Sequence, residues 1–261
     1  MYVVAITELA TPVEQEAAAL AADLGTTPYE ERLNLASGLP AVVLTAADRA
    51  RALALLKALR ARGHGAVAID AAVVVSSEAM VSMRRFGLEE GALTAEGERL
   101  PHGEILALIR AMHRTRTETR AEVKTKKFSP GRALVTGGLL VSKTVSREET
   151  SITEESQQVL YIFRADGGTP WLLRERGTQY AALGGALSPS SAQNFLTAIA
   201  RLRERAPQAV YDERLMATRK VPSRVAVKGG GAAGSASVSS ASGVDLLAHL
   251  IALWVGRGAR F

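Results

Sequence analysis

The chain has 261 residues, 47% of them hydrophobic and 22% charged, and it contains no cysteine. This composition is typical of a globular protein and excludes disulfides, thiolate nucleophiles and cysteine-ligated metals. At one domain per about 150 residues, the length predicts two domains. The net charge of +6 is uneven, because residues 1–80 carry six basic and nine acidic side chains and residues 81–261 carry 26 and 17. The second part is therefore the one that would attract anionic partners.

The segment MYVVAITELATP has neither a basic region nor a long apolar region, so no signal peptide is expected. The sequence also has no uninterrupted run of about 18 apolar residues, the length that a bilayer-spanning helix needs. These features predict a cytoplasmic protein and leave peripheral membrane association open.

Local signals divide the first seventy residues into six elements. Tyr2–Ile6 is an apolar run that is typical of a buried strand. Thr11-Pro12-Val13-Glu14 and Thr27-Pro28-Tyr29-Glu30 each predict a helix start with a capping box, in which threonine and glutamate satisfy free amide groups. Gly25 and Gly38 end these helices. The expected order is strand 2–6, helix 13–24, helix 28–37, strand 39–45, helix 46–62 and strand 66–69.

This order resembles two related small domains, the C-terminal domain of the ribosomal stalk protein and the Clp protease adaptor that presents N-degrons. The resemblance covers residues 1–72 and rests on the helix start at Thr11-Pro12, the breaks at Gly25 and Gly63, and Gly38-Leu39-Pro40 before the middle strand. The resemblance implies that residues 1–72 share the fold of these domains and their general tendency to bind other proteins. Thr7-Glu8-Leu9 stands where the adaptor has an Asn-Asp pair, so degron binding is not carried over.

Residues 71–82 are expected to form a connector to a second domain over residues 82–221. Short strands are predicted at 83–88, 92–95, 141–147, 158–164 and 171–176, and a final helix is predicted from Ser188-Pro189 to the residue before Pro207. This pattern resembles a bacterial pleckstrin-homology-like domain, most clearly at Leu93, Gly97, Leu100-Pro101, Ile105 and Ile109. The resemblance implies binding of proteins, peptides or acidic headgroups without chemistry.

Residues 110–127 carry seven basic and two acidic side chains. From Arg114 onward, charged residues alternate with threonine, alanine or valine, which predicts an extended strand with one charged face. Such a face can simply keep an exposed strand soluble, or it can bind an anionic partner. Acidic protein or lipid ranks above nucleic acid because no aromatic residues interleave the stretch. The candidate binding residues are Arg114, Arg116, Arg120, Lys124 and Lys126.

Residues 222–243 include the run GGGAAGSASVSSASG and are expected to be a flexible linker. The apolar helix predicted at 244–255 is about 18 Å long, too short to cross a bilayer. It could pack on its own chain, join a second copy, dock in a partner groove or lie in a membrane interface. The candidate docking residues are Leu247, Leu250, Ile251 and Trp254.

The sequence contains no recognisable catalytic or cofactor-binding motif. The glycines of residues 131–138 are wrongly spaced for a phosphate loop, and among the histidines only His249 has a carboxylate, Asp245, at ligand spacing. No cofactor and no metal is expected, although an active site assembled from distant residues stays open.

The predicted fold class is α+β. It comprises a small β-α-α-β-α-β domain (1–72), an antiparallel β-rich domain with a C-terminal helix (82–221), a flexible linker (222–243) and a short apolar helix (244–255). The leading functional hypothesis is a non-catalytic adaptor or scaffold that binds protein partners. The alternatives are a peripheral membrane protein that uses its basic strand and C-terminal helix, and an enzyme of unrecognised type. Self-association through the C-terminal helix is a further possibility.

Overall fold

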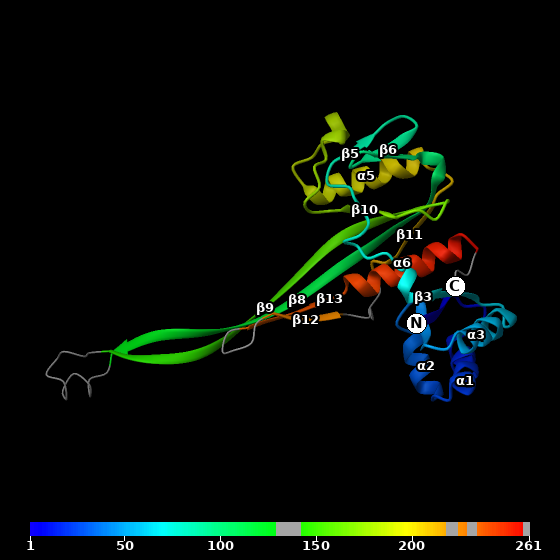
Figure 1. The fold of residues 1–261 in the computed structure, drawn as a ribbon, viewed down its shortest axis with the longest axis horizontal. Helices are drawn as coiled ribbons and strands as arrows, with labels where there is room; N and C mark the ends of the chain where they lie inside the picture. Colours follow the sequence, from blue (N-terminus) through cyan, green and yellow to red (C-terminus); the bar gives the residue numbers. More distant parts are fainter. Residues whose placement is uncertain (129–141, 218–223, 229–233, 258–261) are drawn as a thin grey trace. The chain divides into compact units, whose positions relative to one another are not determined.

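The structure is a computed structural model that describes the backbone of residues 1–128, 142–217, 224–228 and 234–257 (Figure 1). Side chains are described for residues 1–117, 152–217 and 239–257. The chain forms two compact units. Unit 1 comprises Met1–His113, Gln157–Pro222 and Ser240–Phe261, and unit 2 comprises Arg114–Ser156 and Ser223–Ser239. Helices and antiparallel sheets are both present, which confirms the α+β class.

The N-terminal part of unit 1 has the six elements that the sequence predicts, in the predicted order. They are β1 (Tyr2–Glu8), α1 (Val13–Leu24), α2 (Pro28–Leu35), β2 (Ala41–Ala46), α3 (Arg49–Ala61) and β3 (Gly65–Asp70). The three strands form an antiparallel sheet in the order β2-β1-β3. The central strand β1 is almost entirely buried.

Only one of the two predicted capping boxes is present. At α2, the Thr27 hydroxyl accepts a hydrogen bond from the Glu30 amide at 3.3 Å, and the Glu30 carboxylate accepts one from the Thr27 amide at 3.0 Å. At α1 the prediction was wrong, because Pro12 occupies the N-cap and makes no side-chain cap. Thr11 therefore lies one residue outside the helix, beyond reach of the amides that a cap would satisfy.

The sheet β2-β1-β3 is covered on both faces. Residues such as Val4 and Ile6 pack against α1 and α3, whereas Val3 and Ile69, on the opposite face, pack against α6 (Ala241–Val255). Successive side chains of a strand point to opposite faces, so this division follows from the pleat. Helix α6 thus completes a core that begins at Val3, the third residue of the chain.

The rest of unit 1 is built from short strands and one amphipathic helix. The strands β5 (Phe86–Leu88), β6 (Ala92–Ala95) and β7 (Glu98–Pro101) form an antiparallel sheet. The residues of α5 (Ser191–Arg205) that face inward, Phe195, Ile199 and Leu202 among them, pack in one cluster with Leu93 and Trp171. The strand predicted at 92–95 and the final helix are confirmed, and the strand predicted at 83–88 is limited to β5. The two strands predicted at 141–147 and 158–164 belong, over their described residues, to one long strand, Ser142–Arg164.

A larger sheet is ordered β12-β13-β8-β9-β10-β4, with β11 paired in parallel to β8. The bounds of its strands are β4 (Val81–Ser82), β8 (Ile105–Phe128), β9 (Ser142–Arg164), β10 (Trp171–Arg174), β11 (Val210–Leu215), β12 (Arg224–Lys228) and β13 (Gly234–Ser239). Three short 3₁₀ helices complete the described elements: Ala71–Val73, His102–Glu104 and Ala181–Ala186.

Two expectations about domain organisation differ from the structure. The segment expected to be a linker contains β12 and β13, which pair with each other, and β13 also pairs with β8. Its valines favour strands, although the Gly-rich composition around them predicts a linker. The boundary expected between residues 72 and 82 falls inside unit 1, because α6 packs against β1 and β3 and also against β8 and β9.

Candidate functional site

The basic strand surface is defined by five candidate residues of β8: Arg114, Arg116, Arg120, Lys124 and Lys126. The predicted extended conformation is confirmed over this whole stretch. Arg114 and Arg116 are exposed and alternate with the half-buried Thr115 and Thr117, as the period of two predicts. The side chains of Arg120, Lys124 and Lys126 lie outside the described residues.

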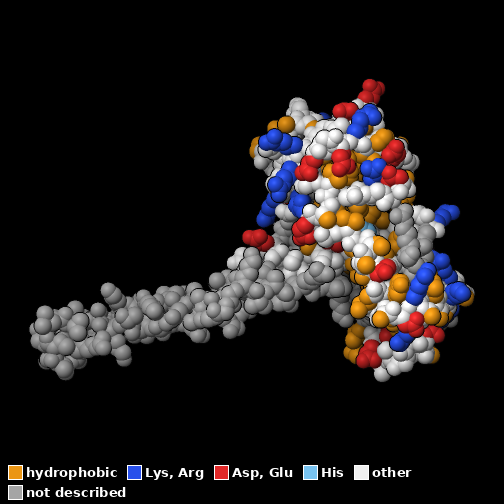
Figure 2. Space-filling model, in the orientation of Figure 1, with side chains coloured by type: hydrophobic (Ala, Val, Ile, Leu, Met, Phe, Trp, Pro, Cys, Tyr) orange, Lys and Arg blue, Asp and Glu red, His pale blue; other side chains and the backbone are white. Residues whose placement is uncertain are grey.

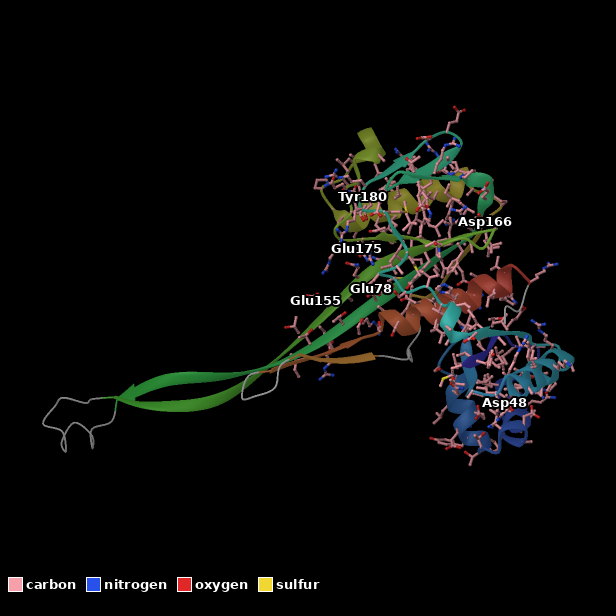
Figure 3. All side chains as sticks on the ribbon, in the orientation of Figure 1. Asp48, Glu78, Glu155, Asp166, Glu175 and Tyr180 are labelled. Carbon is pink, nitrogen blue, oxygen red and sulfur yellow. The ribbon has the colours of Figure 1, made fainter. Side chains whose placement is uncertain are left out.

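Acidic residues of the neighbouring strand lie near the basic strand surface. The guanidinium of Arg116 is 3.9 Å from the Glu154 carboxylate on β9, and the two side chains are 58% and 73% exposed. An ion pair this long and exposed contributes little to stability, so Arg116 remains available to a partner. Glu155, labelled in Figure 3, follows Glu154 on the same strand and is also exposed.

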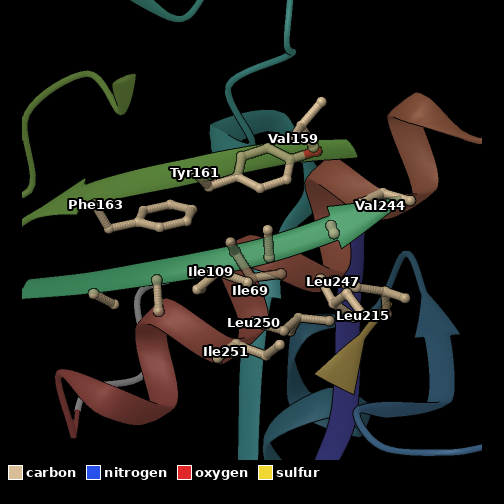
Figure 4. Packing of buried hydrophobic residues seen from close by; sticks show 14 of the residues in the cluster. Ile69, Ile109, Val159, Tyr161, Phe163, Leu215, Val244, Leu247, Leu250 and Ile251 are labelled. Atoms are coloured by element: carbon tan, nitrogen blue, oxygen red, sulfur yellow. The ribbon is translucent and has the colours of Figure 1, made fainter. Parts of the chain in front are cut away.

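The four candidate docking residues of the C-terminal helix are used within unit 1. Leu247, Leu250 and Ile251 are at most 2% exposed and belong to one core cluster with residues of β3, β8 and β9 (Figure 4). Trp254 is partly buried at the edge of that cluster, with the Arg214 guanidinium 5.4 Å from its ring. Among the four docking modes that the sequence left open, the structure shows packing on the same chain.

Close contact with Trp254 also explains why glycine occupies position 65. A Cβ atom placed on Gly65 would lie 2.9 Å from the indole nitrogen of Trp254 and 2.8 Å from Cβ of Glu8. Both distances are shorter than van der Waals contact allows, so only glycine fits at the start of β3. Beside this contact is a hollow of about 250 Å³, lined in part by Arg60, Trp254 and Arg257.

Asp245 is the centre of a buried polar cluster that ties α6 to the connector and to β9. Its carboxylate is 2% exposed and accepts hydrogen bonds from the Ser77 amide at 2.9 Å, the Ser77 hydroxyl and the Tyr161 hydroxyl at 2.7 Å. The Tyr161 oxygen lies 2.6 Å from Nε2 of His113 and, because its own proton is donated to Asp245, it accepts a hydrogen bond from the Nε2–H group. Burial, together with the Asp245 charge, raises the pKa of Tyr161 well above its usual value, so the phenol remains protonated.

His249, one helical turn after Asp245, joins the same region in a defined tautomer. Its Nε2 accepts a hydrogen bond from the Val75 amide at 3.2 Å, and its Nδ1 donates to the Asp245 carbonyl at 2.7 Å. Nε2 can accept this hydrogen bond only when it carries no proton, so the ring is neutral. Burial agrees with this, because it lowers the pKa of His249.

This cluster holds chain segments together, and its residues are not arranged as a nucleophile activated by a histidine base. The Ser77 hydroxyl donates its hydrogen bond directly to Asp245, with no imidazole between them that could accept its proton. The sequence drew attention to Asp245 and His249 only as a metal pair, and it missed Ser77, Tyr161 and His113. A signal was present, since Asp245 is the one carboxylate in an apolar helix and a buried carboxylate needs donors.

A second buried cluster closes the N-terminal part of unit 1. Glu16 is 1% exposed, and its carboxylate is 2.7 Å from the Arg62 guanidinium and 2.5 Å from Nε2 of His64. Nδ1 of His64 accepts a hydrogen bond from the Ala10 amide at 3.0 Å. These bonds fasten α1 to the end of α3, so the cluster has a structural role.

Across the described residues, no three histidine or carboxylate side chains converge in a way that could hold a metal ion. The described helices also include none that is long and apolar enough to cross a membrane. Comparisons of the chain with protein-family models, curated proteins and solved structures find no match. The two resemblances drawn from sequence patterns therefore stay predictions.

Proposed function

We propose that the chain is a non-catalytic adaptor or scaffold protein that binds an acidic protein partner through the basic strand surface. The observation that carries this proposal is the alternation of exposed Arg114 and Arg116 with half-buried threonines on β8. Alternate side chains of a strand are about 6.6–7 Å apart, so Arg114 and Arg116 repel one another, while Glu118 and Glu122 interrupt the basic series further along the strand. An acidic partner relieves this repulsion, so binding lowers the electrostatic energy of the surface.

The polar and charged groups of unit 1 favour a scaffold role. They do not form a second recognition surface with charge of one sign. Its buried polar groups bond to one another around Asp245 and Glu16. On the face shown in Figure 2, acidic and basic side chains of unit 1 are interspersed. Mixed charge of this kind keeps a surface soluble without selecting a partner, whereas an excess of basic charge such as that of residues 110–127 steers association with anionic partners.

A protein partner is favoured over a lipid surface and over nucleic acid. The membrane hypothesis needed the apolar side chains of the C-terminal helix, and Leu247, Leu250 and Ile251 are buried in unit 1. Binding of single-stranded nucleic acid uses aromatic residues for stacking, and residues 110–127 contain none.

The test is a triple substitution, Arg116→Gln, Arg120→Gln and Lys124→Gln, in the full chain. It removes three charges and keeps polar side chains on β8, so we expect normal folding by circular dichroism. Partners are captured from a lysate treated with nuclease and detergent, and the yield is measured between about 50 and 300 mM salt, where screening weakens exposed charge contacts. We expect the triple variant to retain at most a tenth of the protein captured by wild type at low salt.

The matched control replaces three exposed basic residues of unit 1, Arg51, Lys57 and Arg84, with glutamine. It removes the same charge, so we expect its capture to equal that of wild type. If both triple variants lose capture equally, net charge rather than the basic strand surface drives binding. Capture that survives Arg116→Gln, Arg120→Gln and Lys124→Gln at every salt concentration would contradict the proposal.

A further inference from the structure

Unit 2 contains a single layer of four strands with two edges. The order is β12-β13-β8-β9, and the three buried clusters of the structure take no described residue from this unit. Among the described strands, β12 pairs only with β13, and residues 142–156 of β9 pair only with β8. An open sheet edge gains stability when another strand is added to it.

The two edge strands have opposite charge. β12 has the sequence RVAVK, with Arg224 and Lys228 at its ends and no acidic residue. The β9 edge, defined as residues 147–155, has one basic residue and four glutamates: Glu148, Glu149, Glu154 and Glu155. Each edge is therefore complementary to the other and repels a copy of itself, because like charges opposite each other destabilise strand pairing.

The strand directions are also compatible with this pairing. β12 runs antiparallel to β13, and β13 runs antiparallel to β8. β8 is antiparallel to β9, since Arg110 bonds Gln158 and Arg116 lies near Glu154. β12 and β9 consequently run in opposite directions. A second copy translated along the sheet would place its β12 antiparallel to the β9 edge, the more stable of the two pairings.

We propose that unit 2 mediates self-association, in which β12 of one copy adds to the β9 edge of the next. The contact is heterologous, so it leaves one free edge at each end and can repeat into open chains of copies. It is distinct from the basic strand surface of the proposed function, because β8 lies inside the sheet and is not an edge.

Charge-swap variants of the full chain test this pairing. Variant A carries Arg224→Glu and Lys228→Glu, so both of its edges are acidic. Variant B carries Glu149→Lys and Glu155→Lys, so both of its edges are basic, and the Arg116–Glu154 pair is kept. Sedimentation velocity as a function of concentration measures association at about 50 mM and about 300 mM salt, where exposed charges are weakly and strongly screened.

We expect wild type to associate more strongly at low salt, and each variant alone to need at least tenfold higher concentration. An equimolar mixture of A and B should regain association, because acidic and basic edges meet again. This recovery separates edge pairing from misfolding, which mixing cannot repair. A control with Arg51→Glu and Lys57→Glu in α3 should associate like wild type.

Wild type that stays monomeric at low salt and at its highest soluble concentration would overturn the proposal. So would variants that associate as wild type does, or a mixture that fails to recover. Because the substitutions Arg116→Gln, Arg120→Gln and Lys124→Gln leave both edges intact, we expect this variant to lose partner capture and to self-associate like wild type. Retained capture would contradict the proposed function alone, and failed self-association of wild type would contradict the edge pairing alone.

Discussion

Single residues of unit 1 couple its stability to pH. His249 accepts a hydrogen bond from Val75, donates to Asp245 and is neutral in the folded state. Burial lowers its pKa below the ordinary value of 6.5. The unfolded chain takes up a proton near 6.5 and the folded chain does not, so protons favour unfolding below that pH. Burial lowers the pKa of His113 as well, which adds to the same trend.

We therefore predict that the free energy of unfolding is constant above the unfolded pKa and falls as pH decreases below it. The slope is at most about 1.4 kcal/mol per pH unit for each histidine, until the folded pKa is reached. Urea unfolding between about pH 7.5 and about 5.5 measures this without much carboxylate titration. His249→Gln should be less stable at neutral pH and show a shallower slope. An unchanged slope would contradict the role of His249.

Gly65 gives a second prediction at the residue scale. Alanine at this position would bring Cβ within 2.9 Å of the Trp254 indole, so the ring or the strand must move. We expect Gly65→Ala to destabilise the fold by about 1–3 kcal/mol, as overpacking does. Gly103→Ala is the matched control, because nothing lies within 4 Å of its added Cβ. Thermal melting of the two variants measures the difference, and equal melting temperatures would refute the contact.

Elements defined by local signals could be predicted from the sequence, whereas those defined by distant partners could not. The six elements of residues 1–72 follow from apolar runs, prolines and glycines a few residues apart. The alternation of β8 was equally legible, and the structure confirms it for residues 114–117. The Thr11 cap failed by one residue, because a cap depends on where the first helical turn begins.

The packing of α6 was the main feature that local sequence patterns did not predict. Its apolar side chains indicated that the helix binds something, and the Gly-rich segment before it suggested that the helix is independent of the domains. The partner was indicated in β1, since Val3–Ile6 is apolar at every position, as in strands that are covered on both faces. The pairing joins Asp245 to Ser77, 168 residues away, a separation that no sequence window spans.

At the scale of the whole molecule, we predict that α6 makes unit 1 one cooperative body rather than two domains. Leu250 is fully buried in a cluster that contains Val3 and Ile69 of the N-terminal sheet and Val159 and Tyr161 of β9. Removing its side chain should therefore weaken both sheets together. Leu250→Ala is expected to cost about 2–5 kcal/mol, as other truncations of buried leucine do.

Hydrogen exchange of the full chain, followed by mass spectrometry of its peptides, distinguishes the two descriptions. In Leu250→Ala we expect peptides covering β1, β3 and residues 158–164 to lose protection by a similar factor, because global opening exposes them all. Leu196→Ala on α5 serves as the control, since this leucine is 39% exposed and its truncation should cost well under the core value. If Leu250→Ala lowers protection only in β9 and leaves β1 and β3 unchanged, residues 1–72 behave as an independent domain, as the charge asymmetry of the sequence first indicated. Loss of protection in both sheets by one factor would instead establish that a helix near the C-terminus holds the N-terminal sheet in place.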